Sequence, residues 1–227
     1  PVAFALGLTS IAGFINQFGL SFPTELLAQR MVYGVNNFTI IAVPFFIFAA
    51  RVMNTGGVTT RLFNFSNVLV GHFPGGLGQT NILNSMIFAG MSGAAVSDAA
   101  GIGAIEIRAM NDHGYDPDFS AAVTAASSTI GPIIPPSIPM VYYAMQSGTS
   151  VGALFSGGVV PGVLMGISMM FMVYLYAKRG KCPPPRKRPA LKEVGKAFKE
   201  GILPVLTPVI LLGGMYTGWF TPTEAAV

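Results

Sequence analysis

Two stretches of small and polar residues interrupt an otherwise apolar sequence, and both carry the oxygen groups that bind hard cations. The first, AGMSGAAVSDAAG, contains Asp98, the only acid between Arg61 and Glu106. The second, TAASSTIGPIIPPSIP, places several hydroxyls directly before a group of prolines. Hydroxyl, carbonyl and carboxylate oxygens are the ligands that hard cations prefer. These two stretches are therefore the candidate functional residues.

The carboxylate of Asp98 stands out in the first stretch. A charged side chain at membrane depth is expensive, so it is a functional-site candidate by default. The alternative is that Asp98 caps the N-terminus of the following helix. Both roles are compatible, because a helix N-terminus also attracts anionic groups of a ligand. Asn81, Asn84 and Ser85 share one helical face upstream, and we expect them to make interhelical hydrogen bonds rather than to touch substrate.

The prolines of the second stretch are expected to leave backbone carbonyls without partners. Each proline lacks an N–H and so frees the carbonyl four residues earlier. Pro132, Pro135, Pro136 and Pro139 would free the carbonyls of Ser128, Gly131, Pro132 and Pro135. An unpaired carbonyl in hydrocarbon costs several kcal/mol. A bound cation or water would solve this, and the alternative is a kink satisfied by neighbouring hydroxyls.

The composition indicates which elements must position these groups. Of 227 residues, 10% are charged and 52% are hydrophobic, with a mean hydropathy of +0.60. Soluble proteins are about 25% charged, so a soluble enzyme, a nucleic-acid-binding protein and a disordered chain are all disfavoured. The single cysteine, Cys182, excludes an internal disulfide and has no neighbours that would suggest a zinc site.

Long runs without formal charge recur through the whole chain, and each is long enough to cross a bilayer once or more, since one span takes about 20 helical residues. They are Pro1–Thr24, Met31–Ala50, Leu62–Ser97, Phe119–Ala177 and Gly201–Thr223. The sequence therefore predicts an all-α polytopic membrane protein. Because it begins inside an apolar run and ends on TPTEAAV, which is typical of a helix start, we expect an internal fragment of a longer protein.

Most of the 13 basic residues lie in a proline-containing loop at 178–199. By the positive-inside rule this loop should be cytoplasmic; a lipid-headgroup patch or a targeting signal is the alternative. A helix at 151–177 would then arrive from outside. RLFNFSNVLVGHF is too short to cross and should lie along the inner surface. LKEVGKAFKEGI has the apolar spacing of an interfacial amphipathic helix.

The segment 73–110 should start and end on the same side of the membrane. GMSG breaks it near the middle, so each arm has about 17 residues, or about 25 Å of helix. We interpret it as a re-entrant helical hairpin; two short ordinary spans are the alternative. A hairpin combined with a proline-broken helix at 119–145 is typical of secondary transporters, which bind ions and anions where discontinuous helices meet.

The sequence also resembles a known family. GGLGQTNILNSMIFAGMSGAAVSDAAGIGAIEI, GYDPDFSAAVTAASSTIGPIIPPSIP, VPFFIFAARVMNTGG and GWFTPTEAAV are similar to the large membrane subunit of tripartite ATP-independent periplasmic (TRAP) transporters. The family's hairpin tip reads like GxSGSAxAD. Ala94 and Ser97 depart from it as small-for-small replacements, which blurs which hydroxyl is a ligand.

The resemblance implies sodium-driven import of an organic acid by an elevator movement, in the bacterial inner membrane, rather than an enzyme. It implies two partners, namely a periplasmic substrate-binding protein and a small four-helix membrane subunit. Family members carry about eleven spans and two hairpins in inverted repeats, of which this chain resembles the first repeat and the start of the second. The expected organisation is scaffold helices at 1–72, the transport-domain hairpin and broken helix at 73–148, and a further scaffold helix, the basic loop and the start of the second repeat at 149–227.

The resemblance also points to site residues. Those expected to hold sodium are Ser92, Gly93, Asp98, Ser127, Ser128, Gly131 and Pro132. Those expected to contact substrate are Ser92, Gly93, Ala94 and Thr124. Asp98 is not expected to contact the substrate, because both are negatively charged.

Three other functions were weighed against transport by such a protein. An intramembrane aspartyl hydrolase would need a second membrane-embedded Asp beside Asp98, and the remaining aspartates lie in a polar turn at 112–118. A channel would show charged rings or a repeated filter, and neither is present. A divalent-anion sodium symporter without a binding protein is the most serious alternative, because it would use nearly the same site. Sialic acid, C4-dicarboxylates and sugar acids all remain open as substrates.

Overall fold

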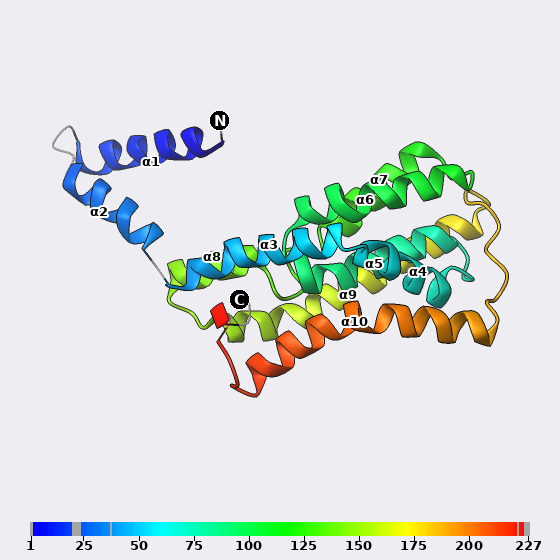
Figure 1. The fold of residues 1–227 in the computed structure, drawn as a ribbon. Coiled ribbons are helices and arrows are strands. Elements are labelled where there is room, and N and C mark those ends of the chain that lie inside the picture. Colours follow the sequence, from blue (N-terminus) through cyan, green and yellow to red (C-terminus); the bar gives the residue numbers. More distant parts are fainter. Residues whose placement is uncertain (1, 20–23, 37, 222, 225–227) are drawn as a thin grey trace. The chain divides into compact units, whose positions relative to one another are not determined.

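The computed structural model describes residues 2–19, 24–36, 38–221 and 223–224, and within these ranges the regular structure is entirely helical. The chain divides into two compact units, Pro1–Asn37 and Phe38–Val227. The first unit contains α1 (Val2–Phe18) and α2 (Thr24–Val35) (Figure 1). The predicted division at residues 72 and 148 concerns transport roles, and it stays a prediction.

The second unit contains the candidate site. Its elements are the 3₁₀-helix η1 (Phe38–Ile41), α3 (Ala42–Thr55), α4 (Val58–Val70), α5 (Gly76–Ser92), α6 (Ala95–Asp112), α7 (Pro117–Ser128), α8 (Ile138–Ser147), α9 (Val151–Lys178) and α10 (Leu191–Tyr216). Figure 1 shows α4, α5, α9 and α10 running alongside one another, with α6 and α7 on another side of α5.

The charge-free run Met31–Ala50 does not form one continuous helix. Helix α2 ends at Val35, and η1 and α3 follow as separate elements. The sequence offers a reason in the two asparagines at 36–37, because asparagine side chains compete for backbone hydrogen bonds and disfavour helix interiors.

Among the described residues, only α9 is by itself long and apolar enough to cross a membrane. Many of its apolar side chains are exposed, including those of Leu164, Ile167 and Phe171, as expected of a helix that contacts lipid. Two segments of α10, Leu191–Ile202 and Pro204–Tyr216, would pass the same test together, although they are bent by 48°. The predicted amphipathic stretch thus continues directly into the next apolar segment.

The helical hairpin is present, with α5 and α6 as its arms. Gly93 ends α5 in the left-handed conformation (φ 62°), and its N–H bonds the Ala89 carbonyl. Ala94 then adopts an extended conformation before α6 begins. A cluster of Leu62, Phe65, Phe88, Met91 and Ile102 packs both arms against α4. The break falls at the predicted GMSG, because glycine adopts the left-handed conformation without steric cost.

The predicted interruption after α7 is also present. The carboxylate of Asp116 caps α7 by accepting from the N–H of Asp118. Turns occupy the residues from Thr129 to Pro136 before α8 begins, and Ser137 caps α8 by accepting from the N–H of Met140. Proline cannot donate to the helical ladder, so the chain stays irregular through Pro136. Pro139 lies in the first turn of α8, where the N–H would have no partner within the helix.

Glycines on one face of α9 let this helix approach the irregular segment and the hairpin. A Cβ at Gly158 would contact the Ile133 carbonyl, one at Gly162 would contact the Ile134 side chain, and one at Gly166 would contact Met86 on α5. Small residues at such spacing permit close helix packing in membranes. Helix α9 therefore packs closely against both the irregular segment and α5.

Candidate functional site

The hairpin tip contacts the proline-broken segment directly, as predicted. The backbone N–H of Ile138 donates to the Gly93 carbonyl at 3.1 Å. On the other side of the tip, Gly131 packs so closely that an added Cβ would lie 3.2 Å from the Ala94 carbonyl carbon and 3.3 Å from the Ala95 nitrogen. The two stretches that interrupt the apolar sequence therefore contact each other in the fold.

Asp98 lies in the first turn of α6 and is 1% exposed. The alternative that it caps this helix is wrong, because Ala94 is the N-cap residue and no side chain caps it. Neither carboxylate oxygen accepts a hydrogen bond of good geometry. The hydroxyls of Ser85 and Ser128 lie close to it, but they donate to Ser127 Oγ and the Thr124 carbonyl instead. A buried carboxylate with both oxygens free is a strong candidate for a cation ligand.

A buried hydrogen-bond network joins α5 to α7 beneath the tip. Asn81 Nδ2 donates to Thr124 Oγ1 at 2.8 Å, and Asn81 Oδ1 accepts from Ser127 Oγ at 2.7 Å. Ser85 Oγ donates to Ser127 Oγ at 3.1 Å. The prediction that Asn81 and Ser85 make interhelical bonds is confirmed. Asn84 does so as well, but to the other arm of the hairpin.

This network places Thr124 and Ser127 among structural contacts. Thr124 Oγ1 also donates to the Ser120 carbonyl at 2.8 Å, so its hydroxyl already has two partners. A Cβ at Gly103 on α6 would lie 2.7 Å from the Thr124 methyl group. The network therefore fixes α5, α6 and α7 relative to one another, and the assignment of these hydroxyls to ligands stays a prediction.

Two of the four carbonyls freed by the prolines have found new donors. The Ser128 carbonyl accepts from the Gly131 N–H at 3.1 Å, and the Pro132 carbonyl accepts from Ser137 Oγ at 2.5 Å. Within the described part of the chain, the carbonyls of Gly131 and Pro135 have no hydrogen-bond donor. One backbone N–H and one hydroxyl thus satisfy two of the freed carbonyls, which leaves the other two carbonyl oxygens available close to the tip.

A hollow of about 510 Å³ lies beside the hairpin tip, between α3 and the start of α6. The predicted residues Ser92 and Ala94 line it, together with Arg51, Asn54 and Ser97. Ser92 is 1% exposed and its hydroxyl has no hydrogen-bond partner. The hollow therefore combines a buried free hydroxyl with the cationic side chain of Arg51.

Two residues of this region were not predicted as site residues. Arg51 is one of them, because nothing in the sequence relates α3 to the hairpin tip. Glu106 on α6 is 1% exposed and accepts from Asn84 Nδ2 at 2.8 Å. Its position between Ile105 and Ile107 was a usable signal, because an acid flanked by isoleucines at membrane depth is as unusual as Asp98.

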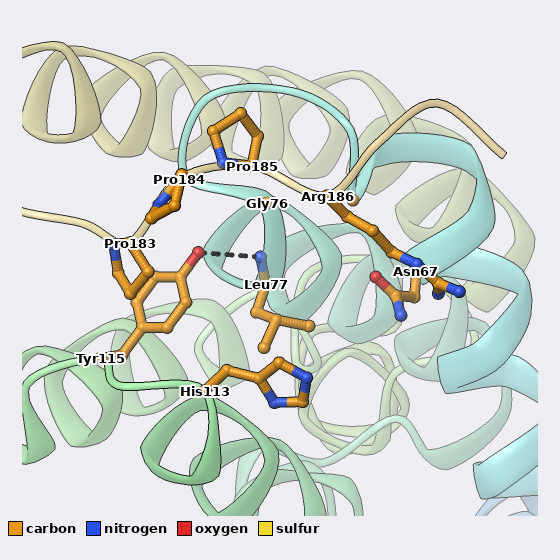
Figure 2. A pocket seen from close by; sticks show the side chains of 10 residues that line it. Asn67, Gly76, Leu77, His113, Tyr115, Pro183, Pro184, Pro185 and Arg186 are labelled. Carbon is orange, nitrogen blue, oxygen red and sulfur yellow. Dashed lines mark hydrogen bonds between the residues drawn. The ribbon is translucent and has the colours of Figure 1, made fainter.

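A second hollow, of about 560 Å³, lies at the other end of the hairpin, and none of the predicted site residues lines it. Figure 2 shows Tyr115 and His113 on one side, Pro183–Pro185 above them, and the Arg186 and Asn67 side chains next to each other. The N–H of Leu77 donates to the Tyr115 hydroxyl at 3.1 Å. Burial raises the pKa of Tyr115, so its hydroxyl keeps its proton. The bond from Leu77 joins the start of α5 to the turn that follows α6.

Comparison with known proteins places the chain in a family. The family model described as the DctM component of tripartite ATP-independent periplasmic transporters matches residues 1–227. The sialic acid TRAP transporter large permease protein SiaM of Vibrio cholerae is 47% identical, over 100% of this chain and 52% of that protein. The 2,3-diketo-L-gulonate TRAP transporter large permease protein YiaN of Escherichia coli is 39% identical, over 99% of this chain and 52% of that protein.

The C4-dicarboxylate TRAP transporter large permease protein DctM of Vibrio cholerae is 41% identical, over 100% of this chain and 49% of that protein. The chain thus spans about half the length of these curated relatives. Their names are those of transporter permeases rather than of enzymes. Because the family model matches from the first residue to the last, the chain belongs to the DctM component family of tripartite ATP-independent periplasmic transporters.

Proposed function

We propose that the full-length protein imports an organic acid across the bacterial inner membrane, driven by a sodium gradient. This proposal depends on one observation: the Gly93 tip contacts the proline-broken segment, and buried side-chain oxygens without hydrogen-bond partners lie beside this contact. Transporters of this construction bind ions and anions where discontinuous helices meet. The hairpin and the broken helix would move together against the scaffold, as an elevator.

Sodium would bind between the tip and the broken segment. The available oxygens are both carboxylate oxygens of Asp98, the Ser92 hydroxyl and the Gly131 carbonyl. The hydroxyl of Ser128, which lies close to Asp98, would complete the set. A cation beside Asp98 would offset the cost of burying its charge. That gain is absent without the ion, so ion binding would stabilise the assembled tip.

The substrate carboxylate would occupy the hollow beside the tip. Arg51 supplies positive charge there, and Ser92 and the backbone around Ala94 supply polar contacts. The sodium ion would lie on the other side of the tip residues. In a site of low dielectric constant, a cation and an anion stabilise each other strongly. This mutual stabilisation is the physical basis that we propose for coupling.

We further propose that two partners work with the chain. A periplasmic binding protein would deliver the substrate, and a small four-helix membrane subunit would support the scaffold. The basic loop at 178–199 would face the cytoplasm, where positive loops are retained. The relatives are named for sialic acid, diketogulonate and C4-dicarboxylates, so the substrate class is an organic acid whose identity needs direct assay.

The test is uptake by proteoliposomes that contain the full-length protein and its small subunit, with a panel of organic acids. We expect uptake only when the binding protein is present and an inward sodium gradient is imposed. Uptake without the binding protein would favour the divalent-anion sodium symporter alternative. Uptake with equal rates under potassium and sodium gradients would contradict the coupling ion.

A further inference from the structure

A second buried acid, Glu106, lies on α6 outside the proposed sodium site. It follows Asp98 by eight residues, or about 12 Å along the helix axis. Its Oε1 accepts from Asn84 Nδ2 on α5 at 2.8 Å, whereas its Oε2 has no partner. An ionised carboxylate in this position would be costly, because burial disfavours an unpaired charge.

Asn84 shows the complementary deficiency. It is fully buried at 0% exposure, its Nδ2 donates to Glu106, and its Oδ1 has no partner. The two side chains therefore share one hydrogen bond and are left with one unpaired oxygen each. Both unpaired atoms are acceptors as long as Glu106 is ionised, so neither can satisfy the other.

One proton removes both deficiencies. We propose that Glu106 binds a proton at Oε2 and donates it to Asn84 Oδ1, which closes a two-bond acid–amide pair between the arms of the hairpin. The proton comes from hydronium in the solvent: one O–H bond of hydronium breaks to leave water, and one O–H bond forms at Oε2. Each side chain then donates once and accepts once. The hairpin thus contains a proton-binding site separate from the oxygens at its tip.

The surroundings favour a proton over a metal cation. A hard cation takes several oxygen ligands at once, whereas among the described residues the unpaired side-chain oxygens at this level are Glu106 Oε2 and Asn84 Oδ1. The oxygens at the tip belong to Asp98 and Ser92, about two helical turns away. A single small cation cannot contact both levels.

The charged groups near Glu106 also favour its protonated form. The elements packed against α6 are α7, α5 and α4, and Asn54 on α3 approaches Gly101 near the start of α6. Arg51 on α3 is exposed and lines the hollow beside the hairpin tip, which Glu106 does not line. Helix α5 carries no titratable side chain, and the aspartates at the start of α7 and Arg61 on α4 are exposed. Asp98 is the charged group that acts electrostatically on Glu106, and it repels a second negative charge. Protonation of Glu106 leaves Asp98 as the single negative charge beside the tip.

The test uses infrared spectroscopy on the full-length protein in lipid, because the C=O stretch of a protonated carboxylic acid is separate from carboxylate bands. Glu106→Gln keeps both hydrogen bonds, since its amide also donates once and accepts once toward Asn84. We expect it to lose one protonated-acid band while the melting temperature is unchanged. The matched control Asp118→Asn, at an exposed acid on α7, should keep that band.

Survival of the band in Glu106→Gln, or its loss in Asp118→Asn, overturns the proposal. So does a tenfold rise in the sodium concentration for half-maximal binding in Glu106→Gln, which would make Glu106 a cation ligand. Asn84→Ala tests the pairing independently of the first variant. It should shift the Glu106 band to higher frequency by removing its acceptor, and an unshifted band means that Asn84 is not the partner. These spectra do not depend on the proposed transport activity.

Discussion

The backbone N–H of Ile138 donates to the carbonyl of Gly93 at 3.1 Å, so the first residue of α8 holds the tip of the hairpin. This bond joins the two interruptions of the helical pattern through backbone atoms alone. Substitution of the side chains around it changes the site without removing this link. The hairpin tip and the start of α8 are therefore expected to behave as one structural unit.

The first prediction concerns the close approach at Gly93. Gly93→Ala should destabilise the full-length protein and abolish uptake, because its Cβ would lie 2.5 Å from the Pro136 carbonyl oxygen. Gly148→Ala is a matched control, since Gly148 has a similar φ of 69° but nothing within 4 Å of an added Cβ. The left-handed conformation alone costs an alanine roughly 1–2 kcal/mol. Equal losses of melting temperature in the two variants would contradict the proposed contact.

The second prediction concerns the charge of Asp98. Asp98→Asn preserves the size of the side chain but removes the charge that a bound cation would neutralise. A hydrogen bond or contact to a charged group contributes about 1.5–3 kcal/mol, so the sodium concentration for half-maximal uptake should rise at least about tenfold. Asp118→Asn, at an exposed acid on α7, should leave it unchanged. An unaltered sodium dependence of uptake in Asp98→Asn would contradict the assignment of Asp98 to the sodium site.

A third prediction separates structural hydroxyls from ligands. If Asn81 and Thr124 serve mainly to join α5 and α7, Asn81→Leu and Thr124→Val should be non-additive in the free energy of unfolding. Interhelical hydrogen bonds in membranes contribute about 0.6 kcal/mol on average, which sets the expected coupling. Asn81→Leu combined with Ser156→Ala, at an exposed hydroxyl on α9, should be additive. Additivity in both pairs would mean that the network contributes no coupling.

The hairpin and the broken helix were predictable because backbone chemistry specifies them locally. Gly93 permits the left-handed turn, and the prolines between 132 and 139 remove N–H donors wherever they occur. The meeting of these two segments followed from the general construction of transporters. Hydrophobicity alone was less informative, since the run at 31–50 has no formal charge and yet is divided among α2, η1 and α3.

The partners of individual side chains were not predictable. Asn81, Asn84 and Ser85 share a broad helical face, yet the first and last bond α7 whereas Asn84 bonds α6. Their partners depend on how far α6 and α7 rotate about their axes, which no local pattern specifies. The same applies to Arg51, because its place beside the hairpin tip follows from the packing of α3 against α5.

The final prediction tests the role of Arg51 in binding the substrate. Its exposed guanidinium lines the hollow next to Ser92 and Ala94, and no acid forms an ion pair with it within the described ranges. Arg51→Gln should therefore raise the KM for organic acids about tenfold or more, because a charge-assisted contact contributes about 1.5–3 kcal/mol.

Arg61→Gln is the matched control, because Arg61 is also exposed but lies on α4 away from the hollow. It removes the same charge from the same unit and should leave KM unchanged. A general effect of net charge on the membrane surface would alter both variants alike. Arg51→Lys keeps the charge but loses the planar guanidinium that binds a carboxylate through two hydrogen bonds. Its KM should therefore lie between that of Arg51→Gln and that of Arg61→Gln. Full activity of Arg51→Gln with every acid tested would place the substrate carboxylate elsewhere on the tip.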